Sequence, residues 1–176
     1  MKIRSLPVDG AHLVEIDLLR DDRGFFARTF DASMFADAGL ISTVLQQSVS
    51  WSAAAGTLRG IHWQAEPYGE DKLVRCTSGR AFDVLVDVRR GSETYRAAAA
   101  VVLDSTEHNA VYVPRGVAHG FLSLTDGTEL LYQMSAPYEP SSQRGLRWND
   151  PGLRVDWPNA PVVISSRDST FPDHSW

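Results

Sequence analysis

Short apolar or alternating segments, separated by tight-turn sequences, are the feature that most restricts the fold of this chain. Eight such segments lie at residues 12–19, 56–64, 71–76, 80–88, 98–104, 110–114, 119–124 and 128–134. The sequences TSGR, RRGS, PRG and TDGT stand among them and supply the glycine, proline, aspartate and serine residues that turns favour. Many short strands with frequent turns predict an all-β protein, folded as a barrel or sandwich that leaves few exposed sheet edges.

One segment favours a helix and another favours irregular chain. Asp31 can cap the start of a short helix within residues 31–40, and Gly39 can end it in a left-handed conformation. From Trp148 to the C-terminus the chain is rich in proline and turn residues, so it is expected to wrap irregularly over the strands. With 176 residues, 43% of them hydrophobic, and no repeat or long linker, the chain is expected to form one domain over residues 1–176.

Composition and charge limit the classes of partner and the cellular compartment that are expected for this chain. A net charge of −5 gives no broad basic field, so nucleic-acid binding is not expected, although a local pocket for a phosphorylated small molecule remains open. The longest apolar run, residues 97–103, is too short to cross a membrane, and the N-terminus lacks the apolar core of a signal peptide. The single cysteine, Cys76, is expected to be a buried small hydrophobe, and the sequence predicts a cytoplasmic protein.

The segment LRGIHWQ, residues 58–64, places an arginine and a histidine on either side of one glycine. In a regular strand Arg59 and His62 would point to opposite faces, because successive side chains alternate. Gly60 lies between them and tolerates a β-bulge, which would bring both side chains to one face. The segment therefore predicts a strand that is bent at a functional place.

Two of the five histidines are candidates for chemistry. His62 and His119 each lie in an apolar strand beside a glycine, where an imidazole needs a polar partner. A core histidine satisfied by hydrogen bonds is the alternative for either residue. The other three, at positions 12, 108 and 174, lie among polar or terminal residues and are expected at the solvated surface.

The surroundings of these two histidines bear on metal binding. The segment PRGVAHGF around His119 resembles the second metal-binding motif of the cupin superfamily. The first cupin motif normally has two histidines one residue apart, but here His62 is followed by Gln64, and a carboxamide is a poor ligand for a transition metal. A pocket that does acid–base work without a metal or cofactor is therefore expected.

Three further side-chain types are candidates for the same pocket. The chain has 15 arginines but only two lysines, Lys2 and Lys72. An ammonium group can sit against one developing oxyanion, which makes Lys72 a candidate electrostatic catalyst; a lysine at a strand edge without function is the alternative. Asp83 and Asp87 share one strand face, where one of them can orient a buried cation or histidine, or both can be solvated. Tyr132 has the strand parity of core positions, so it is either a core tyrosine or a proton donor.

These residues together make the chain resemble one known family, the dTDP-4-dehydrorhamnose 3,5-epimerases, which are cupin-fold sugar-nucleotide epimerases. The resemblance covers nearly the whole chain, and the joint order and spacing of its landmarks are highly specific. The landmarks are DDRGFFARTF (21–30), LRGIHWQ (58–64), DKLVRC (71–76), FDVLVDVRRGSETY (82–95), VPRGVAHGF (113–121), LLYQMSAPYEP (130–140), RWNDPGL (147–153) and SSRD (165–168).

The resemblance implies a cupin-type jelly roll and assigns roles to particular residues. It implies that His62 is the catalytic base, that Asp168 pairs with it, that Tyr132 is the opposing acid and that Lys72 stabilises an enolate. It also implies a homodimer that shares strands, so that some site residues can act across the subunit interface. Contacts to the nucleotide or sugar are implied for Arg23, Phe26, Gln46, Arg59, His119 and Arg167.

The enolate chemistry of a 4-keto sugar is consistent with these implied roles. In a 4-keto-6-deoxyhexose, C3 and C5 both flank the carbonyl carbon, so loss of either proton gives an enolate whose charge rests on O4. An imidazole with a carboxylate partner can remove the proton, and an acid on the other face can return one and so invert the carbon. Arg23 and Arg59 can hold the dTDP diphosphate through bidentate contacts. The expected activity is epimerisation of a dTDP-4-keto-6-deoxyhexose at C3, C5 or both, in deoxysugar biosynthesis.

Four positions in substrate-contacting stretches depart from the family pattern, and one of them is Trp63, where the family usually has tyrosine or phenylalanine. Arg28 stands where the family usually has a glutamate, Ser48 where it has an asparagine, and Gln143 where it has another glutamate. These departures leave the nucleotide, the sugar and the choice between double and single epimerisation open. Two other classes of protein are alternatives: a metal-dependent cupin oxygenase or isomerase, and a non-catalytic module that binds sugar nucleotides.

Overall fold

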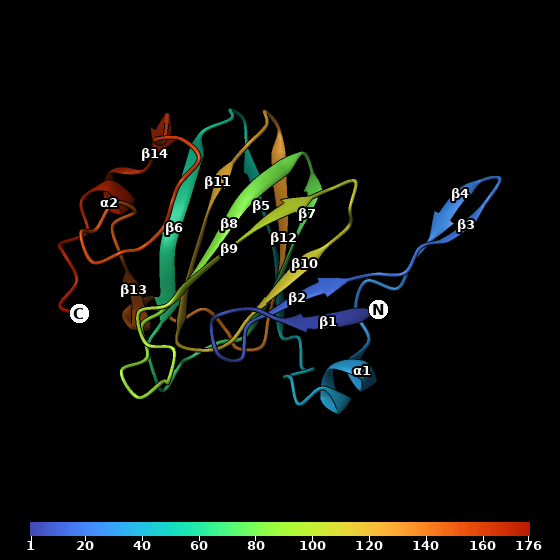
Figure 1. Cartoon of the computed structure of the whole chain (residues 1–176), viewed down its shortest axis with the longest axis horizontal. Coiled ribbons are helices and arrows are strands. Elements are labelled where there is room, and N and C mark those ends of the chain that lie inside the picture. The colour runs from blue at the N-terminus through green and yellow to red at the C-terminus, as the bar shows by residue number, and fades with distance from the viewer.

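Two antiparallel β-sheets face each other and form the body of the molecule (Figure 1). The computed structural model describes residues 1–176, the whole chain. The first sheet has the order β1-β2-β10-β7-β12-β5, with strands at Lys2–Ser5 (β1), His12–Glu15 (β2), Ala110–Val113 (β10), Lys72–Ser78 (β7), Thr128–Met134 (β12) and Gln46–Ser52 (β5). The predicted all-β sandwich is thereby confirmed.

The second sheet carries three of the eight landmark segments, in β6, β8 and β11. Its order is β13-β6-β11-β8-β9, with strands at Gln143–Gly145 (β13), Thr57–Gln64 (β6), Val117–Ser123 (β11), Arg80–Asp87 (β8) and Ala98–Asp104 (β9). A short strand, β14 at Val163–Ile164, pairs in parallel with β6 and brings the C-terminal chain back beside it.

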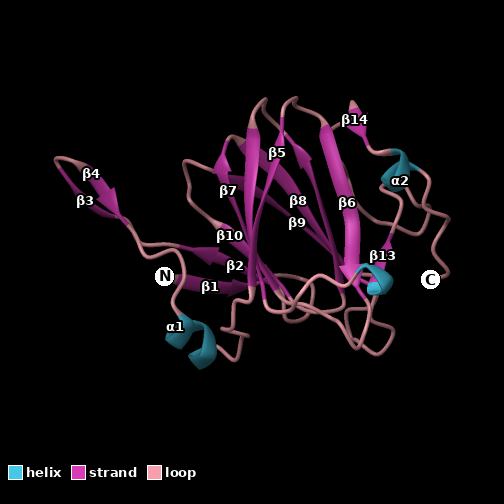
Figure 2. Ribbon diagram, turned by 180° about the vertical axis from the view of Figure 1, so that it is seen from behind, coloured by secondary structure: helices cyan, strands magenta, loops and turns pink.

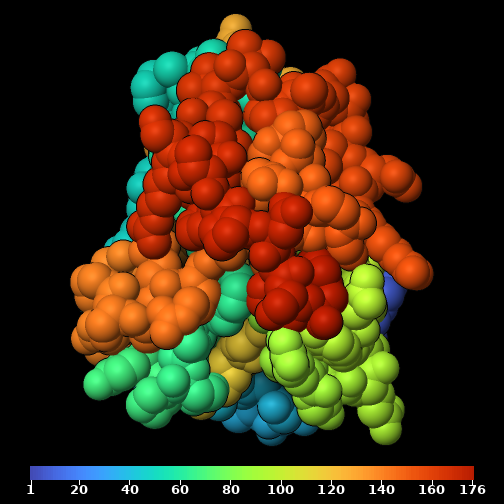
Figure 3. Space-filling view, turned by 90° about the vertical axis from the view of Figure 1, so that its left-hand side faces the viewer, coloured from blue at the N-terminus to red at the C-terminus, as the bar shows by residue number.

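Alternation along the strands divides the side chains between two buried layers. In β8, Ala81 and Leu85 point between the sheets and join a core cluster of 13 buried residues, whereas Val84 and Val86 join a separate cluster on the outer face. That outer face is buried because the C-terminal chain lies over it, as Figure 3 shows in orange to red. Trp157 and its neighbours from this chain pack against the outer cluster, so the predicted C-terminal wrap is confirmed.

The predicted N-terminal helix is present and is short. Helix α1 spans Ala32–Asp37; the Asp31 side chain caps it by accepting hydrogen bonds from the backbone N–H groups of Ser33 and Met34. Gly39 follows the helix with φ +73°, the left-handed conformation that glycine adopts without a Cβ penalty. Two further short helical segments, η1 (Pro140–Ser142) and α2 (Ser166–Ser169), were not predicted. None of the helices has the length and apolar character that crossing a bilayer takes.

A two-stranded hairpin leaves the body of the molecule. Strands β3 (Leu19–Asp21) and β4 (Gly24–Phe26) pair only with each other and extend away from both sheets, as Figures 1 and 2 show from opposite sides. Leu19 and Phe26 are each 67% exposed, which is unusual for large apolar side chains.

Three expectations about single residues can be compared with the structure. Cys76 is buried, as predicted, and burial raises the pKa of its thiol to about 11. The prediction of solvated side chains for His12, His108 and His174 is wrong, since all three are half-buried. His174, for example, packs edge-on against the Trp176 ring at a centroid distance of 4.8 Å, because the chain end folds back over the second sheet.

Candidate active site

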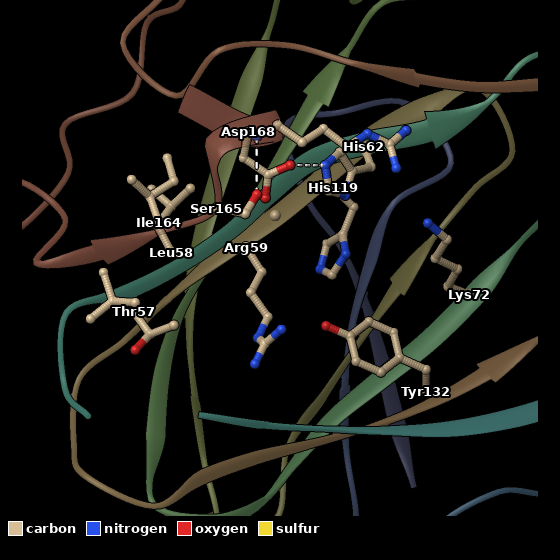
Figure 4. Close-up of a pocket in the computed structure, with 13 residues that line it drawn as sticks. Thr57, Leu58, Arg59, His62, Lys72, His119, Tyr132, Ile164, Ser165 and Asp168 are labelled. Atoms are coloured by element: carbon tan, nitrogen blue, oxygen red, sulfur yellow. Dashed lines mark hydrogen bonds and ion pairs between the residues drawn. The ribbon is translucent and has the colours of Figure 1, made fainter. Parts of the chain in front are cut away.

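A cavity of about 590 Å³ opens between the two sheets, beside the C-terminal chain. Its lining includes the predicted residues His62, Lys72, Tyr132 and Asp168, whose side chains Figure 4 shows around one space. A second cavity of about 300 Å³ adjoins it, and both are lined by His62, Lys72 and Tyr132. Three of the four residues predicted to be catalytic therefore line both cavities, and the fourth, Asp168, lines the larger one.

A β-bulge in β6 brings Arg59 and His62 to the same cavity. In the pairing with β11, Phe121 lies opposite Arg59 and His119 lies opposite His62, so one residue of β11 faces two of β6. Gly60 takes φ +117°, and a Cβ atom there would lie 2.6 Å from the Cα of the facing glycine in β11. The predicted bend at Gly60 is thus confirmed, and only glycine permits this approach of the two strands.

His62 is held by a carboxylate that comes from far along the chain. Its Nε2 lies 2.7 Å from Asp168 Oδ1, and the other Asp168 oxygen accepts a hydrogen bond from the Gly60 backbone N–H at 3.1 Å. Burial by itself would raise the pKa of Asp168, but the hydrogen bonds from His62 and Gly60 outweigh it and lower that pKa. Asp168 is therefore an ionised carboxylate that fixes the His62 ring, with Nε2 donating and Nδ1 left free.

Helix α2 and the chain after it surround this pair. The Ser165 hydroxyl caps α2 by accepting a hydrogen bond from the Asp168 N–H at 3.1 Å. The ring of Phe171, just beyond α2, packs edge-on against the His62 ring with the centroids 5.9 Å apart. The His62 imidazole is therefore restrained both by a hydrogen bond and by an aromatic contact.

A second histidine–aspartate pair lies deeper between the sheets. His119 Nε2 lies 2.9 and 3.0 Å from the two oxygens of Asp83, and the two side chains are 4% and 0% exposed. Burial raises the pKa of Asp83, against the opposing charges of His119 and Lys72. Of the two interpretations open for Asp83, orientation of a buried histidine is confirmed.

Asp87 shares a strand face with Asp83 but has different hydrogen-bond partners. Its side chain is buried and accepts hydrogen bonds from the Arg89 guanidinium and the hydroxyls of Ser92 and Thr94. Burial alone would raise its pKa, but these bonds lower it to about 2. Asp87 therefore organises the turn after β8 and lies outside the two cavities.

Tyr132 borders the cavity from the opposite sheet. It belongs to β12 of the first sheet, whereas His62 belongs to β6 of the second, so the two side chains enter from opposite walls (Figure 4). Its ring lies edge-on to His119 at a centroid distance of 6.0 Å. Burial, followed by the negative charge of Asp83, raises the pKa of the Tyr132 hydroxyl, so this group keeps its proton at neutral pH.

Two arginines at the cavity have no carboxylate partner. The Arg59 guanidinium donates to the Trp51 carbonyl at 2.8 Å and to the Ser52 hydroxyl at 3.3 Å. Arg167 lies on α2 with its guanidinium 5.9 Å from the centre of the Phe171 ring. Cations that are not neutralised within the chain are the groups best suited to an anionic ligand.

The adjoining cavity contains three other predicted residues. Gln46 and Ser48 lie in β5 and Gln143 begins β13, and all three line this cavity. Tyr138 lines it as well and donates its hydroxyl proton to the Gln143 side-chain oxygen. Sequence reasoning missed Tyr138 and Glu70, although Glu70 stands two residues before Lys72 and strand parity could have indicated it.

Three predicted contact residues lie away from both cavities. Arg23 and Phe26 belong to the protruding hairpin, where Arg23 pairs with Asp21, and Arg28 pairs with Asp31 at the start of α1. None of the three lines the cavities of its own chain. Their contact with substrate stays a prediction, and the family resemblance implies that some site residues act across a subunit interface.

The residue that replaces the second cupin histidine has a structural role. The Gln64 side chain donates hydrogen bonds to the carbonyls of Tyr68 and Pro137 and accepts one from the Glu139 N–H. It therefore ties the loop after β6 to the loop after β12. No group of three or more His, Cys, Asp or Glu side chains is arranged to hold a metal ion. The metal-free character of the site stays a prediction.

Comparisons with known proteins show the family of the chain. A family model described as dTDP-4-dehydrorhamnose 3,5-epimerase matches residues 5–175. The dTDP-4-dehydrorhamnose 3,5-epimerase of Sinorhizobium fredii is 40% identical over 177 residues, which covers 98% of this chain and 89% of that protein. The dTDP-4-dehydrorhamnose 3-epimerase of Streptomyces niveus is 36% identical over 169 residues, which covers 96% of this chain and 81% of that protein.

A solved structure extends the likeness to the fold. The 3,5-epimerase of Legionella pneumophila, in complex with dTDP-4-keto-L-rhamnose, superposes with a TM-score of 0.89 at 32% identity, covering 96% of this chain and 89% of that one. Fold and site together define the class as sugar-nucleotide isomerases built on a β-sandwich. The chain belongs to the dTDP-4-dehydrorhamnose 3,5-epimerase family, whose members epimerise dTDP-linked 4-keto-6-deoxy sugars.

Proposed function

We propose that this chain binds a dTDP-4-keto-6-deoxyhexose with its sugar ring between His62 and Tyr132 and inverts carbons next to the C4 carbonyl. The observation that supports this most directly is that His62 and Tyr132 enter the cavity from opposite sheets. A base candidate with an ionised carboxylate partner stands on one sheet, and a protonated phenol stands on the other. Inversion of a carbon acid needs a base on one face and an acid on the opposite face.

The proposed reaction is two proton transfers through an enolate. His62 Nδ1 takes the proton from C3 or C5, the electrons of that C–H bond form the C–C double bond, and the carbonyl electrons move to O4. Lys72 donates a hydrogen bond to O4 as its charge grows. Tyr132 then protonates the carbon from the other face while the C4 carbonyl forms again. Proton exchange with solvent returns His62 and Tyr132 to their starting states.

The nucleotide part of the substrate is proposed to contact the two arginines without a carboxylate partner and to extend into the adjoining cavity. Arg59 and Arg167 are proposed to bind the diphosphate, since neither has a carboxylate partner within the chain. The structure of the Legionella pneumophila enzyme holds a dTDP-linked 4-keto sugar, which supports dTDP as the nucleotide. Gln46, Ser48 and Tyr138 line the second cavity, which is large enough for further parts of this ligand.

The function is tested by incubation with dTDP-4-keto-6-deoxyglucose in D₂O. Deuterium at C3, C5 or both, read by NMR and mass spectrometry together with the product configuration, is the expected result and identifies the carbons that the enzyme addresses. Retention of all protium, with the nucleotide still bound, would favour a non-catalytic binding module. Catalysis that needs a stoichiometric transition metal, found by elemental analysis and lost with a chelator, would favour a metal-dependent cupin enzyme.

We further propose that the active form is a homodimer in which the β3–β4 hairpin of one copy covers the site of the other. The hairpin carries exposed Phe26 and lies outside the body of its own chain. Strand β5 ends the first sheet and exposes Val49 and Trp51, each 58% exposed, beside the second cavity. Exposed apolar residues on a sheet edge and on a protruding hairpin are surfaces that a second copy can bury.

Mixed dimers test this arrangement. One variant loses the hairpin side chains (Arg23→Ala with Phe26→Ala), and the other loses the base (His62→Ala). Each alone is expected to be nearly inactive, whereas co-expressed chains should regain activity, because one site then combines an intact His62 with an intact hairpin from the other copy. Mixed dimers that stay as inactive as the separate variants would show that the hairpin does not act in trans. Light scattering coupled to gel filtration measures the oligomeric state of each variant.

A further inference from the structure

An ion pair at the start of β7 lies where the two cavities meet, beside the proposed position of the sugar ring. Lys72 Nζ lies 3.2 Å from Glu70 Oε1, and the two side chains are 13% and 11% exposed. Both line the smaller cavity, and Lys72 also lines the larger one. We infer that this pair recognises an α-hydroxy ketone, with Glu70 accepting a hydrogen bond from the sugar hydroxyl next to the carbonyl. The inference rests on the proposed function, in which Lys72 donates to O4.

The chain between the two charged residues is fixed. Glu70 and Lys72 both line the cavity, whereas Asp71 between them points away, as alternation in extended chain requires. Asp71 accepts a hydrogen bond from the Tyr112 hydroxyl at 2.8 Å, and its backbone N–H donates to the Ser135 hydroxyl at 2.8 Å. These bonds tie the segment to neighbouring strands on both sides, so Glu70 and Lys72 are held in place before any ligand binds.

Glu70 has hydrogen-bonding capacity that the chain does not use. An ionised carboxylate offers about four acceptor sites on its two oxygens. The contact with Lys72 is the single polar contact of the Glu70 side chain, and it uses one oxygen. A ligand that fills the cavity displaces water from the other oxygen, and an acceptor buried without a partner costs free energy. A well-matched ligand must therefore bring a donor to Glu70.

A 4-keto sugar with a hydroxyl on C3 matches this donor and acceptor. Its carbonyl oxygen accepts a hydrogen bond, its O3–H donates one, and the two oxygens stand on adjacent carbons, about one hydrogen-bond length apart. Lys72 Nζ and Glu70 Oε1 have a similar separation, 3.2 Å. Lys72 can thus hold O4 while Glu70 holds O3. A sugar without the 3-hydroxyl leaves Glu70 unpaired, so Glu70 becomes a specificity-determining residue for the C3 substituent.

The test compares dTDP-4-keto-6-deoxyglucose with its 3-deoxy analogue, using the rate of deuterium uptake from D₂O. The wild-type enzyme is expected to prefer the hydroxylated substrate by about 10- to 100-fold in kcat/KM, the range for one hydrogen bond to a charged group. Glu70→Leu has a similar size but no acceptor, and it is expected to lose this preference, with the analogue used almost as well as by wild type. Glu70→Gln keeps a neutral acceptor and is expected to fall between the two.

Glu66→Gln is the matched control, because it removes the same charge from an exposed position in the same loop. It should keep the full preference, and melting temperatures should be recorded for every variant. Equal use of both substrates by the wild type, or a Glu70→Leu enzyme with the wild-type preference, would overturn the inference. If Glu70→Leu does not fold, the wild-type comparison and Glu70→Gln still decide. Absence of deuterium uptake from both substrates in the wild type would refute the proposed function instead.

Discussion

Two histidine–aspartate pairs place their histidines at one cavity, and the pairs differ in solvation. In the His62–Asp168 pair the histidine is 27% exposed, and the carboxylate has a further donor in the Gly60 N–H. In the His119–Asp83 pair the side chains are 4% and 0% exposed, and Asp83 has His119 as its only hydrogen-bond partner. The same two residue types are thus placed once at a cavity wall and once in the interior.

The pKa values of the two carboxyl groups are shifted in opposite directions. The pKa of Asp168 is lowered because its hydrogen bonds outweigh its burial, whereas the pKa of Asp83 is raised because burial outweighs its partners. Asp168 can therefore stabilise the positive charge that His62 gains when it takes a proton. Asp83 offers less of this stabilisation to His119. The comparison therefore supports the proposal that His62 is the base, and it favours a binding role for the His119 pair beside Tyr132.

The largest expected effect separates the two histidines. His62→Ala should lower deuterium uptake at every epimerised carbon by about 10³-fold or more, because one positioned base is worth about 10²- to 10⁴-fold. His119→Ala should lower it by only about 10-fold. NMR in D₂O measures the uptake, and calorimetric titration with dTDP checks that both variants still bind nucleotide. Equal losses in the two variants would remove the distinction between the pairs.

Substitution of Asp168 should reduce kcat more than substitution of Asp83, and both reductions should be smaller than the loss caused by His62→Ala. Asp168→Asn removes the charge that stabilises protonated His62 and is expected to reduce kcat by about 10²-fold. Asp83→Asn keeps an acceptor for His119 at a position where burial already disfavours the charge, so about a 10-fold reduction or less is expected. Steady-state kinetics on the keto sugar measure both. A larger loss for Asp83→Asn would assign the base to the buried pair.

Tyr132, which lies edge-on to His119, should affect inversion more than exchange. In Tyr132→Phe the enolate can still form, and His62 can return a solvent-derived proton to the face it left. We expect recovered substrate that carries deuterium in its original configuration, with epimerised product lowered by about 10²-fold. A tyrosine that only fills the core would lower exchange and inversion together, along with the melting temperature.

The smallest expected effect concerns the pH dependence of the unfolding free energy, to which Asp168 and Asp83 should contribute with opposite slopes. A carboxyl whose folded pKa is lowered stabilises the fold above its unfolded pKa, near 3.8, and loses that contribution as pH falls through the folded pKa. A carboxyl whose folded pKa is raised stabilises the fold below 3.8 and loses that contribution as pH rises through the folded pKa. The loss of unfolding free energy caused by Asp168→Asn should therefore increase as pH rises from about 3 to 5. The loss caused by Asp83→Asn should decrease over the same range.

Urea denaturation of the wild type and both variants across this pH range measures these profiles. A change of about 1 kcal/mol corresponds to somewhat less than one unit of pKa and is large enough to resolve. Slopes of the same sign for the two variants would contradict the assigned protonation states.

Sequence alone determined most of the β-architecture and part of the site. Strand alternation depends only on neighbouring residues, so parity predicted β8 with Asp83 and Asp87 on one face, whereas the structure shows that this face points between the sheets. The bulge at Gly60 and the cap at Asp31 were equally local, because each depends on one residue type at one place. Strand β5 was missed because its polar sequence shows no core-facing alternation, although pairing with β12 holds it in the sheet.

Only the tertiary structure decided how the charged groups are solvated and which of them meet. The family resemblance implied that His62 pairs with Asp168, 106 residues away, but no local pattern indicates that α2 folds back to place one against the other. The same holds for the buried pair of His119 and Asp83, which consists of the same two residue types as the first pair. The free energy of a charge depends on the dielectric and on the donors around it, and both are set by long-range packing.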